Sequence, residues 1–454
     1  MAWRVLTLTV LAFVVRLQLF LSSAEPTGWD GYSYVVQVER FVSEGRLHWP
    51  DASWVTYFLA ALHVVIPSAI VAVKVGACLL AALVVPAAWR LGGWPLALWA
   101  AASPTLTHLA GDFAKNLGVV APLLVVLAWK RTDARVPLIV SVLLAAIAHR
   151  LGAALVVALA LGALLGALLS NSTPRRVLTL GMFTAVGFAA LTAWLPNLLH
   201  PADLERLSGQ LTFSPGVPTP WPYFSLRATS WPERVELLLA WPALLFGIWR
   251  FITQRAERVR LGALLLPLAV CVFPLWRTDQ LDVGYRLALM APVFAFPVLL
   301  AHVPSRTWLL VPLVLLARTG FDPAVTPPWA SWRAIIARIP RPLPPLLIAP
   351  QGFNFLYDHE TQHESLAWSP EPSLDRTTIY RLAWDLTDGE WAEFTADLTP
   401  QPERLGPDVV YVREDVWERV LERTRDDPDD GLQARLHTWK NPSRVRPRSL
   451  LRNH

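Results

Sequence analysis

A succession of long apolar segments is the feature that most constrains the fold of this chain. Hydrophobic residues make up 54% of its 454 residues and charged residues only 17%, and the apolar segments lie before residue 320. A helix of about 20 apolar residues crosses the hydrocarbon core of a bilayer. The sequence therefore predicts a mainly α-helical, polytopic transmembrane domain over residues 1–319.

The apolar segments indicate a bundle of about eleven helices, since short and proline-broken helices are tolerated in membrane bundles. They lie near residues 5–21, 54–91, 94–109, 117–129, 136–148, 151–170, 177–199, 235–252, 259–276, 284–302 and 307–317.

The composition changes after residue 319. Prolines and charges crowd together around 338–345, and no later apolar segment is long enough to span a bilayer. We expect a proline-rich linker over 320–345 and a small soluble α/β domain over 346–454. Its strands are expected near 346–349, 366–368, 378–384 and 408–412.

Basic residues of the short loops decide the orientation. If the chain crosses the membrane only once within 54–91, the loop arginines and lysines fall on one side, with few acids to oppose them. Lys and Arg tend to remain cytoplasmic. We therefore expect a multi-pass protein of the cytoplasmic (inner) cell membrane, with its N-terminus inside and its C-terminal domain outside.

Several classes of function are disfavoured. The formal net charge is only +5 and its bases are dispersed, so a nucleic-acid partner is not expected. The chain has neither a glycine-rich phosphate loop nor a Gly-x-Ser-x-Gly motif, which argues against cytoplasmic nucleotide-driven chemistry. The two cysteines, Cys78 and Cys271, lie in apolar segments and indicate no disulfide.

With this orientation, the polar residues at the ends of apolar segments gather on the outer face. Ionisable groups at membrane depth are candidates for function. The candidates are Asp30, Asp112, Lys115, His149, Arg150 and Arg286. Together they suggest one site that faces outward.

Asp30 lies in the first outer loop, 22–53. The residues that follow it, 32–44, carry apolar side chains at near-helical spacing, which is typical of an amphipathic helix on a membrane surface. Asp30 would either cap that helix or act as a catalytic carboxylate.

The cations allow two interpretations each. Arg16 lies about 18 Å along the first helix from Arg4, and would bind a lipid phosphate or extend to the interface. Lys115 would add a second phosphate contact or pair with Asp112. His149 and Arg150 mark a tight hairpin or part of the site.

Arg286 would contact a ligand or form an ion pair with Asp279 or Asp282. Aromatic rings in the outer loops suit sugar rings and lipid headgroups equally well; they include Trp29, Tyr32, Trp221 and Tyr223. No metal-ligand spacing occurs, so a divalent ion such as Mg²⁺ or Mn²⁺ would be held by Asp30 and Asp112 if the protein binds one.

These features resemble the GT-C superfamily of integral membrane glycosyltransferases, which use polyprenyl-linked sugar donors. The matching residues are Arg16 late in the first helix and Trp29–Tyr32 at the opening of an outer loop, followed by a C-terminal soluble domain. The segments 111–116 and 282–286 are also similar to uncharacterised bacterial members. Members place their catalytic Asp in this loop, often within an Asp-x-Asp or Glu-x-Asp pair that this chain lacks.

The resemblance implies transfer of a sugar from a polyprenyl-phosphate donor to a lipid, glycan or protein acceptor at the outer face. Asp30 would be the general base, with Asp112 as a second catalytic acid, and the cations would stabilise the departing phosphate. Two other classes remain open. A lipid or sugar transporter or flippase would need polar residues through the bilayer midplane, and a non-catalytic scaffold would only present the C-terminal domain.

Overall fold

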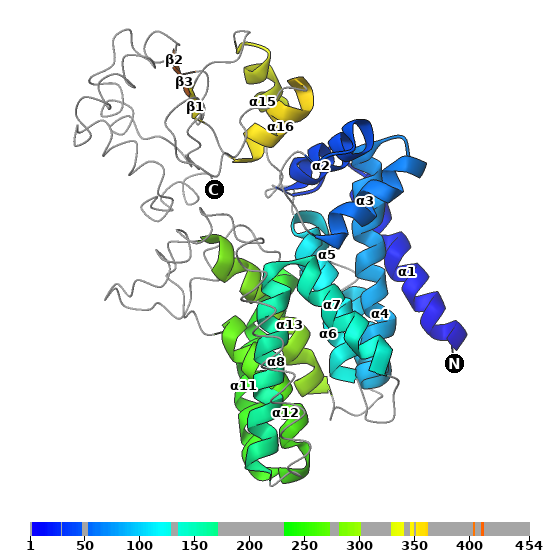
Figure 1. Cartoon of the computed structure of the whole chain (residues 1–454), viewed down its shortest axis with the longest axis vertical. Helices are drawn as coiled ribbons and strands as arrows, with labels where there is room; N and C mark the ends of the chain where they lie inside the picture. Colours follow the sequence, from blue (N-terminus) through cyan, green and yellow to red (C-terminus); the bar gives the residue numbers. More distant parts are fainter. Residues whose placement is uncertain are drawn as a thin grey trace, which may run out of the picture. The chain divides into compact units, whose positions relative to one another are not determined.

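The computed structural model describes residues 2–28, 30–47, 53–128, 135–170, 231–272, 281–300, 328–339, 346–348, 351–361, 403–404 and 410–412. The chain divides into two compact units. The first comprises Met1–Gly31, Gln37–His200 and Phe213–Val325, and the second comprises Tyr32–Val36, Pro201–Thr212 and Thr326–His454. The described part of the chain is mainly helical (Figure 1).

Most of the helices in the described residues lie before residue 301. In chain order they are α1 (Ala2–Leu21), α2 (Gly31–Glu44), α3 (Trp54–Val65), α4 (Ala69–Ala102), α5 (Pro104–Asp112), α6 (Ala114–Ala128), α7 (Arg135–Ala148), α8 (Arg150–Leu169), α11 (Trp231–Thr253), a short 3₁₀ turn η2 (Arg255–Glu257), α12 (Arg258–Val272) and α13 (Leu281–Leu300). Helix α2 covers the residues expected to form an amphipathic helix after Asp30, and its position on a membrane surface stays a prediction.

Four of the described helices are long and apolar enough to cross a membrane. They are Trp3–Leu21, Ala69–Ala102, Leu151–Leu169 and Pro232–Thr253. Shorter apolar helices cover Trp54–Val65, Ala114–Ala128, Val136–Ala148 and Arg286–Leu300. The segments expected at 177–199 and 307–317 lie outside the described residues, so the number of about eleven spans stays a prediction.

Helix α4 is broken at Gly93, which has non-helical dihedral angles (φ 70°, ψ −153°). Lys74 near its start donates to the carbonyl of Ser23, while Ala100 near its end accepts from Arg16. A straight helix would separate Lys74 from Ala100 by about 39 Å, but only seven residues separate their two partners. The chain therefore turns back at the break, and both ends of α4 lie beside the same half of α1.

Helices α8 and α12 cross at glycines. A Cβ atom added at Gly162 would lie 2.0 Å from the carbonyl oxygen of Gly262, and one at Gly166 would lie 2.2 Å from that of Arg258. Small residues four positions apart allow membrane helices to approach this closely. Figure 1 shows α8 and α12 side by side along much of their length.

Arginines gather at one end of this bundle. Arg258 donates to the terminal carbonyls of α11 at Phe251 and Ile252, both at 2.9 Å, and to Leu169 at the end of α8. Arg250 is bound to Glu257 at the same end. Arg250 lies 17 residues after Glu233 on α11, or about 26 Å along a helix axis, which approaches the ~30 Å hydrocarbon core of a bilayer.

The second unit, described by itself, contains α15 (Trp329–Ile336), α16 (Gln351–Thr361) and three short strands. The strands β1 (Leu346–Ile348), β2 (Glu403–Arg404) and β3 (Val410–Val412) form an antiparallel sheet in the order β1-β3-β2. Strands β1 and β3 coincide with two of the expected strands. The expected strands at 366–368 and 378–384 lie outside the described residues, so the α/β domain stays a prediction.

Helix α15 lies within the segment expected to be a linker, 320–345. Its apolar side chains Trp329, Trp332, Ile335 and Ile336 recur at helical spacing and are buried. The ring of Trp332 packs edge-to-face on Phe353 of α16, with centroids 5.8 Å apart. The segment therefore contains a packed helix, because its prolines lie outside these eight residues and do not interrupt them.

Candidate functional site

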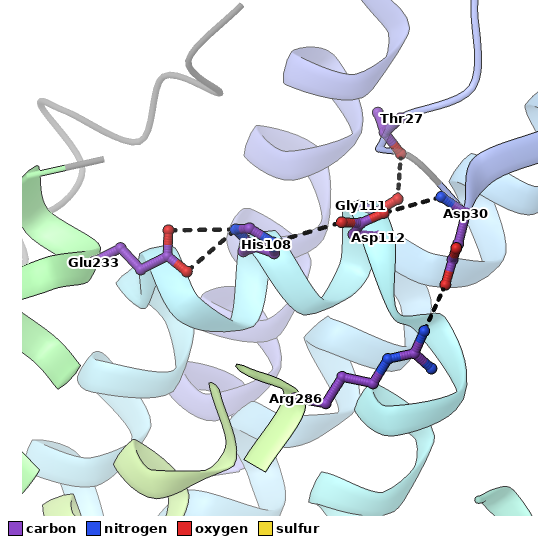
Figure 2. Close-up of polar contacts among 7 residues, drawn as sticks. All are labelled: Thr27, Asp30, His108, Gly111, Asp112, Glu233 and Arg286. Atoms are coloured by element: carbon purple, nitrogen blue, oxygen red, sulfur yellow. Dashed lines mark hydrogen bonds and ion pairs between the residues drawn. The ribbon is translucent and has the colours of Figure 1, made fainter. Parts of the chain in front are cut away.

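The loop that carries Asp30 is fastened to the C-terminal end of α5. Thr27 Oγ1 donates to the carbonyl of Gly111 at 3.1 Å, and the Asp30 amide donates to Asp112 Oδ1 at 3.0 Å (Figure 2). Gly28 lies between them with φ +71°, and a Cβ atom there would lie 2.5 Å from Asp112 Oδ1. Only glycine fits this position, because the left-handed backbone and the close contact both exclude a side chain.

Asp30 occupies the N-cap position of α2, but its carboxylate makes no capping hydrogen bond. Instead, Asp30 Oδ2 accepts from Arg286 Nη2 at 3.1 Å, and each of the two side chains is 21% exposed. The Arg286 guanidinium also lies over the ring of Phe113, 4.5 Å from its centroid. Asp30 is thus a carboxylate held by a cation and still reached by solvent.

Asp112 is buried and faces donors on two sides. Its Oδ1 accepts from the Asp30 amide, and its Oδ2 lies 3.8 Å from Nε2 of His108, one turn earlier on α5. The residue is only 2% exposed. This geometry suits a group that positions Asp30, and it differs from the expectation of a second catalytic acid.

His108 lies between two carboxylates. Its Nδ1 is 3.2 Å from Glu233 Oε1 and 3.3 Å from Glu233 Oε2 on α11, while its Nε2 faces Asp112. An ionised carboxylate only accepts hydrogen bonds, and only the imidazolium form has a donor on both ring nitrogens. Figure 2 shows the resulting array of Glu233, His108, Asp112, Asp30 and Arg286.

Sequence reasoning missed His108 and Glu233. His108 lies inside the apolar segment 94–109, and Glu233 lies just before the segment 235–252. A signal was present, because His108 and Asp112 are four residues apart and therefore share one face of a helix. Glu233 is also an ionisable group at the end of an apolar segment, as Asp112 is.

A second buried carboxylate on α11, that of Glu236, holds the start of α5. It accepts from Trp99 Nε1 at 2.9 Å, from Ser103 Oγ at 2.9 Å and from the Thr105 amide at 3.0 Å. These donors satisfy it, and none of them belongs to the Asp30 loop. Glu233 and Glu236 thus fasten different parts of α5 to α11.

Arg16 donates hydrogen bonds to protein groups and does not form the expected phosphate clamp. Its Nε donates to Thr107 Oγ1 at 3.0 Å, and its Nη2 donates to the carbonyls of Ala100 at 2.9 Å and Ser103 at 3.4 Å. The residue is only 3% exposed. Carbonyls at the end of a helix lack intrahelical partners, and the guanidinium satisfies that of Ala100 where α4 ends.

His149 caps α8. Its Nδ1 accepts from the Leu151 amide at 3.1 Å, and Ser53 Oγ donates to the preceding carbonyl, that of Ala148, at 2.6 Å. This explains the histidine as a helix N-cap without a ligand. The side chain of Arg150 lies outside the described residues, and Lys115 is half-buried in the first turn of α6.

Tyr32 is fully buried within the second unit. Its ring lies 4.9 Å from Trp329 and 5.0 Å from His359, and Arg333 Nη2 donates to its hydroxyl at 2.7 Å. The ring packs against protein and does not present a face to a sugar. The other expected aromatic contacts, Trp29, Trp221 and Tyr223, lie outside the described residues.

The carboxylates do not fit a divalent cation as they are arranged. Among the described residues, no group of three or more His, Cys, Asp or Glu side chains is placed to hold a metal ion. Asp112 faces an amide and an imidazolium, and Asp30 faces a guanidinium. Each of these neighbours donates hydrogen bonds or carries positive charge, so they disfavour a cation between the two carboxylates.

Comparison of the chain with protein-family models, with curated proteins and with solved structures gives no match. The assignment of a function therefore depends on the geometry of the site and on the residues that resemble GT-C enzymes.

Proposed function

We propose that this protein is an inverting membrane glycosyltransferase of the GT-C type. It would transfer a sugar from a polyprenyl-phosphate donor to a lipid, glycan or protein acceptor at the outer face of the membrane. The observation that carries the proposal is the pair of Asp30 and Arg286, a carboxylate and a guanidinium 3.1 Å apart and partly exposed, in a chain otherwise rich in apolar helices.

The reaction would be one displacement at the anomeric carbon. Asp30 accepts the proton of the acceptor hydroxyl as the acceptor oxygen bonds to the anomeric carbon. The bond from that carbon to the phosphate oxygen breaks, and its electron pair leaves with the polyprenyl phosphate. Arg286 has five N–H donors and binds the departing phosphate beside the base.

The surroundings favour this chemistry. Arg286 is oriented by the ring of Phe113, and the Asp30 backbone is held by Asp112, so neither group needs to reorganise when charge develops. Charge stabilisation by oriented groups in a partly dry site exceeds its value in water. Loss of the base typically costs about 10²–10⁴-fold in rate.

The distribution of arginines supports a site on the outer side of the membrane. Arg250 and Arg258 lie at the end of α11 opposite Glu233, and Glu233 contacts the array that contains Asp30. Arginine-rich ends of membrane bundles tend to be cytoplasmic. The Asp30 end would then face outward, where polyprenyl-phosphate sugars serve as donors in enzymes of this class.

The test is a transfer assay with purified protein in liposomes. A panel of radiolabelled polyprenyl-phosphate hexoses and pentoses is supplied with membrane extract as acceptor, and both labelled product and released polyprenyl phosphate are measured. Asp30→Asn should lower turnover at least about 100-fold while the protein remains folded.

The matched control is Glu44→Gln, which removes an exposed carboxylate at the other end of α2. This variant should transfer sugar at the wild-type rate. Turnover that is unchanged in Asp30→Asn would remove Asp30 from the chemistry. Movement of labelled donor across the bilayer without product would instead favour a flippase.

A further inference from the structure

The residues behind Asp30 form a continuous line of alternating charge. Glu233 contacts His108, His108 faces Asp112, and Asp112 accepts from the Asp30 amide (Figure 2). Of these, Glu233, His108 and Asp112 are all buried. Burial of two carboxylates is costly unless a cation lies between them.

We propose that His108 is a positioning residue for Asp30, acting through Asp112. This inference deepens the proposed function: the expected fall in kcat rests on that function, whereas the expected change in hydrogen exchange does not. The imidazolium compensates the charges of Glu233 and Asp112, and it keeps Asp112 oriented toward the amide of Asp30. His108 itself touches neither Asp30 nor a reacting atom in this arrangement.

Asp112 has two carboxylate oxygens, and each is directed at a different group: Oδ1 at the Asp30 amide and Oδ2 at His108 Nε2. Loss of the imidazolium leaves Asp112 beside Glu233 in a buried setting with no cation between them. The carboxylate would then turn toward other donors or take up a proton, and the Asp30 amide would lose its acceptor.

Gly28 makes the placement of Asp30 sensitive to Asp112. A Cβ atom at Gly28 would lie 2.8 Å from the Asp112 Cα atom and 2.5 Å from its Oδ1, so the loop backbone lies directly on this residue. A movement of Asp112 should therefore displace the loop directly, because the two backbones are in contact. Displacement of a catalytic group by about 1 Å can cost about 100-fold in rate.

The experiment compares His108→Gln with Glu236→Gln. Glutamine keeps a hydrogen-bond donor at position 108 but removes the charge. Glu236 lies one turn after Glu233 on α11 and fastens α5 at Ser103 and Thr105, away from the Asp30 loop. It therefore controls for general loosening of α5.

Two properties are measured in detergent-solubilised full-length protein: hydrogen exchange of the amides in residues 24–31 by mass spectrometry, and kcat and KM for the labelled donor. In His108→Gln, exchange of this segment should accelerate at least about tenfold and kcat should fall about 100-fold, with donor KM changed by less than about threefold. In Glu236→Gln, exchange of residues 24–31 should remain as slow as in the wild type.

A double variant covers the case in which the single substitution prevents folding. His108→Gln with Glu233→Gln removes one cation and one anion, so the net charge of the buried array is unchanged. It should fold and still show fast exchange in residues 24–31, because Asp112 has lost the imidazolium.

The outcomes separate the inference from the proposed function. Slow exchange and wild-type kcat in His108→Gln would overturn the inference, even when Asp30→Asn is inactive. Fast exchange in His108→Gln together with full activity of Asp30→Asn would overturn the proposed function, while the role of His108 in holding the loop would stand. Equal acceleration in Glu236→Gln would also overturn the inference, since loosening of α5 would then explain the effect.

Discussion

Two helix contacts in the first unit are built in opposite ways. Helices α8 and α12 meet at Gly162, Gly166 and Gly262, where their backbones approach so closely that no side chain fits. Helices α5 and α11 meet through Glu233 and Glu236, whose carboxylates are buried against an imidazole, an indole, a hydroxyl and an amide. The first contact is made by shape, and the second by charge and hydrogen bonds.

The difference indicates where function is found in a bundle of apolar helices. A glycine crossing achieves close packing with no polar group to satisfy, so it needs no explanation beyond stability. Buried carboxylates require several partners before their burial is tolerated, so the contacts of Glu233 with His108 and of His108 with Asp112, behind Asp30, point to a use. The comparison can be tested by substitutions that should affect stability at one contact and activity at the other.

The largest effect on stability is expected from Arg16→Met. Arg16 donates to Thr107 and to the carbonyls of Ala100 and Ser103, and its loss removes the guanidinium donor from the buried Ala100 carbonyl and from Thr107 Oγ1. The free energy of unfolding should fall by about 3 kcal/mol, measured by denaturant titration in detergent. The KM for the labelled donor should be unchanged in the folded fraction.

Arg4→Met is the control, since Arg4 is exposed near the start of the same helix. It should leave stability and KM at their wild-type values. A raised KM in Arg16→Met with unchanged stability would contradict the structural role and restore Arg16 as a phosphate contact.

The next effect is expected from Gly162→Leu, which places a large side chain at the α8–α12 crossing. The added atoms meet the backbone of Gly262, which cannot rotate away as a side chain can. Overpacking of this kind typically costs about 1–3 kcal/mol. Ala154→Leu adds bulk on the exposed face of the same helix and should be neutral.

Measurement of kcat in Gly162→Leu makes this test more specific. Molecules of Gly162→Leu that remain folded should keep the wild-type kcat, because the crossing is made by shape and does not touch the charged array. A large fall in kcat without loss of stability would show that the two contacts are coupled.

Some of these features can be predicted because a local pattern of residues encodes them, and others cannot because they depend on tertiary packing. The mainly helical fold with helices long enough to span a membrane is predictable because apolar length is a local property. Helix α2 is predictable because its apolar residues recur at helical spacing. Asp30 and Arg286 were candidates because each is a charge at the end of an apolar segment. Their pairing, across 256 residues of sequence, was not predictable, since it depends on how the Asp30 loop and α13 each pack against α5.

Other residues show where local reasoning fails. Arg16 and His149 are polar residues in or beside apolar segments, as ligand contacts would be, yet Arg16 donates to a carbonyl at the end of α4 and His149 caps the start of α8. Only the positions of the neighbouring carbonyls and amides distinguish these roles, and the tertiary structure sets those positions. Helix α15 was hidden for a different reason, because the prolines around it outweighed the helical spacing of its apolar residues.

A smaller effect is expected from Gly28→Ala, with Gly45→Ala as its control. Both glycines have φ +71°, but a Cβ atom at Gly28 would meet Asp112, whereas one at Gly45 would have nothing within 4 Å. Each substitution should cost about 1 kcal/mol of stability through the left-handed backbone alone. Only Gly28→Ala should lower kcat, since only its added atom displaces the carboxylate that holds Asp30. Equal kcat values for the two variants would show that contact with Asp112 is not needed for activity.

The smallest effect is expected from Thr27→Val, which removes the bond from Thr27 Oγ1 to the Gly111 carbonyl and keeps the shape of the side chain. One partly buried hydrogen bond typically contributes about 0.5–1.5 kcal/mol. Thr7→Val is the matched control, because it removes the same type of bond, to the Trp3 carbonyl, at an exposed position of α1. Hydrogen exchange of residues 24–31 should accelerate in Thr27→Val and stay at the wild-type rate in Thr7→Val. If exchange stays slow in Thr27→Val, the Thr27 bond is not needed to hold the loop on α5. The contacts of the Asp30 amide and Gly28 with Asp112 would then be sufficient to position the loop.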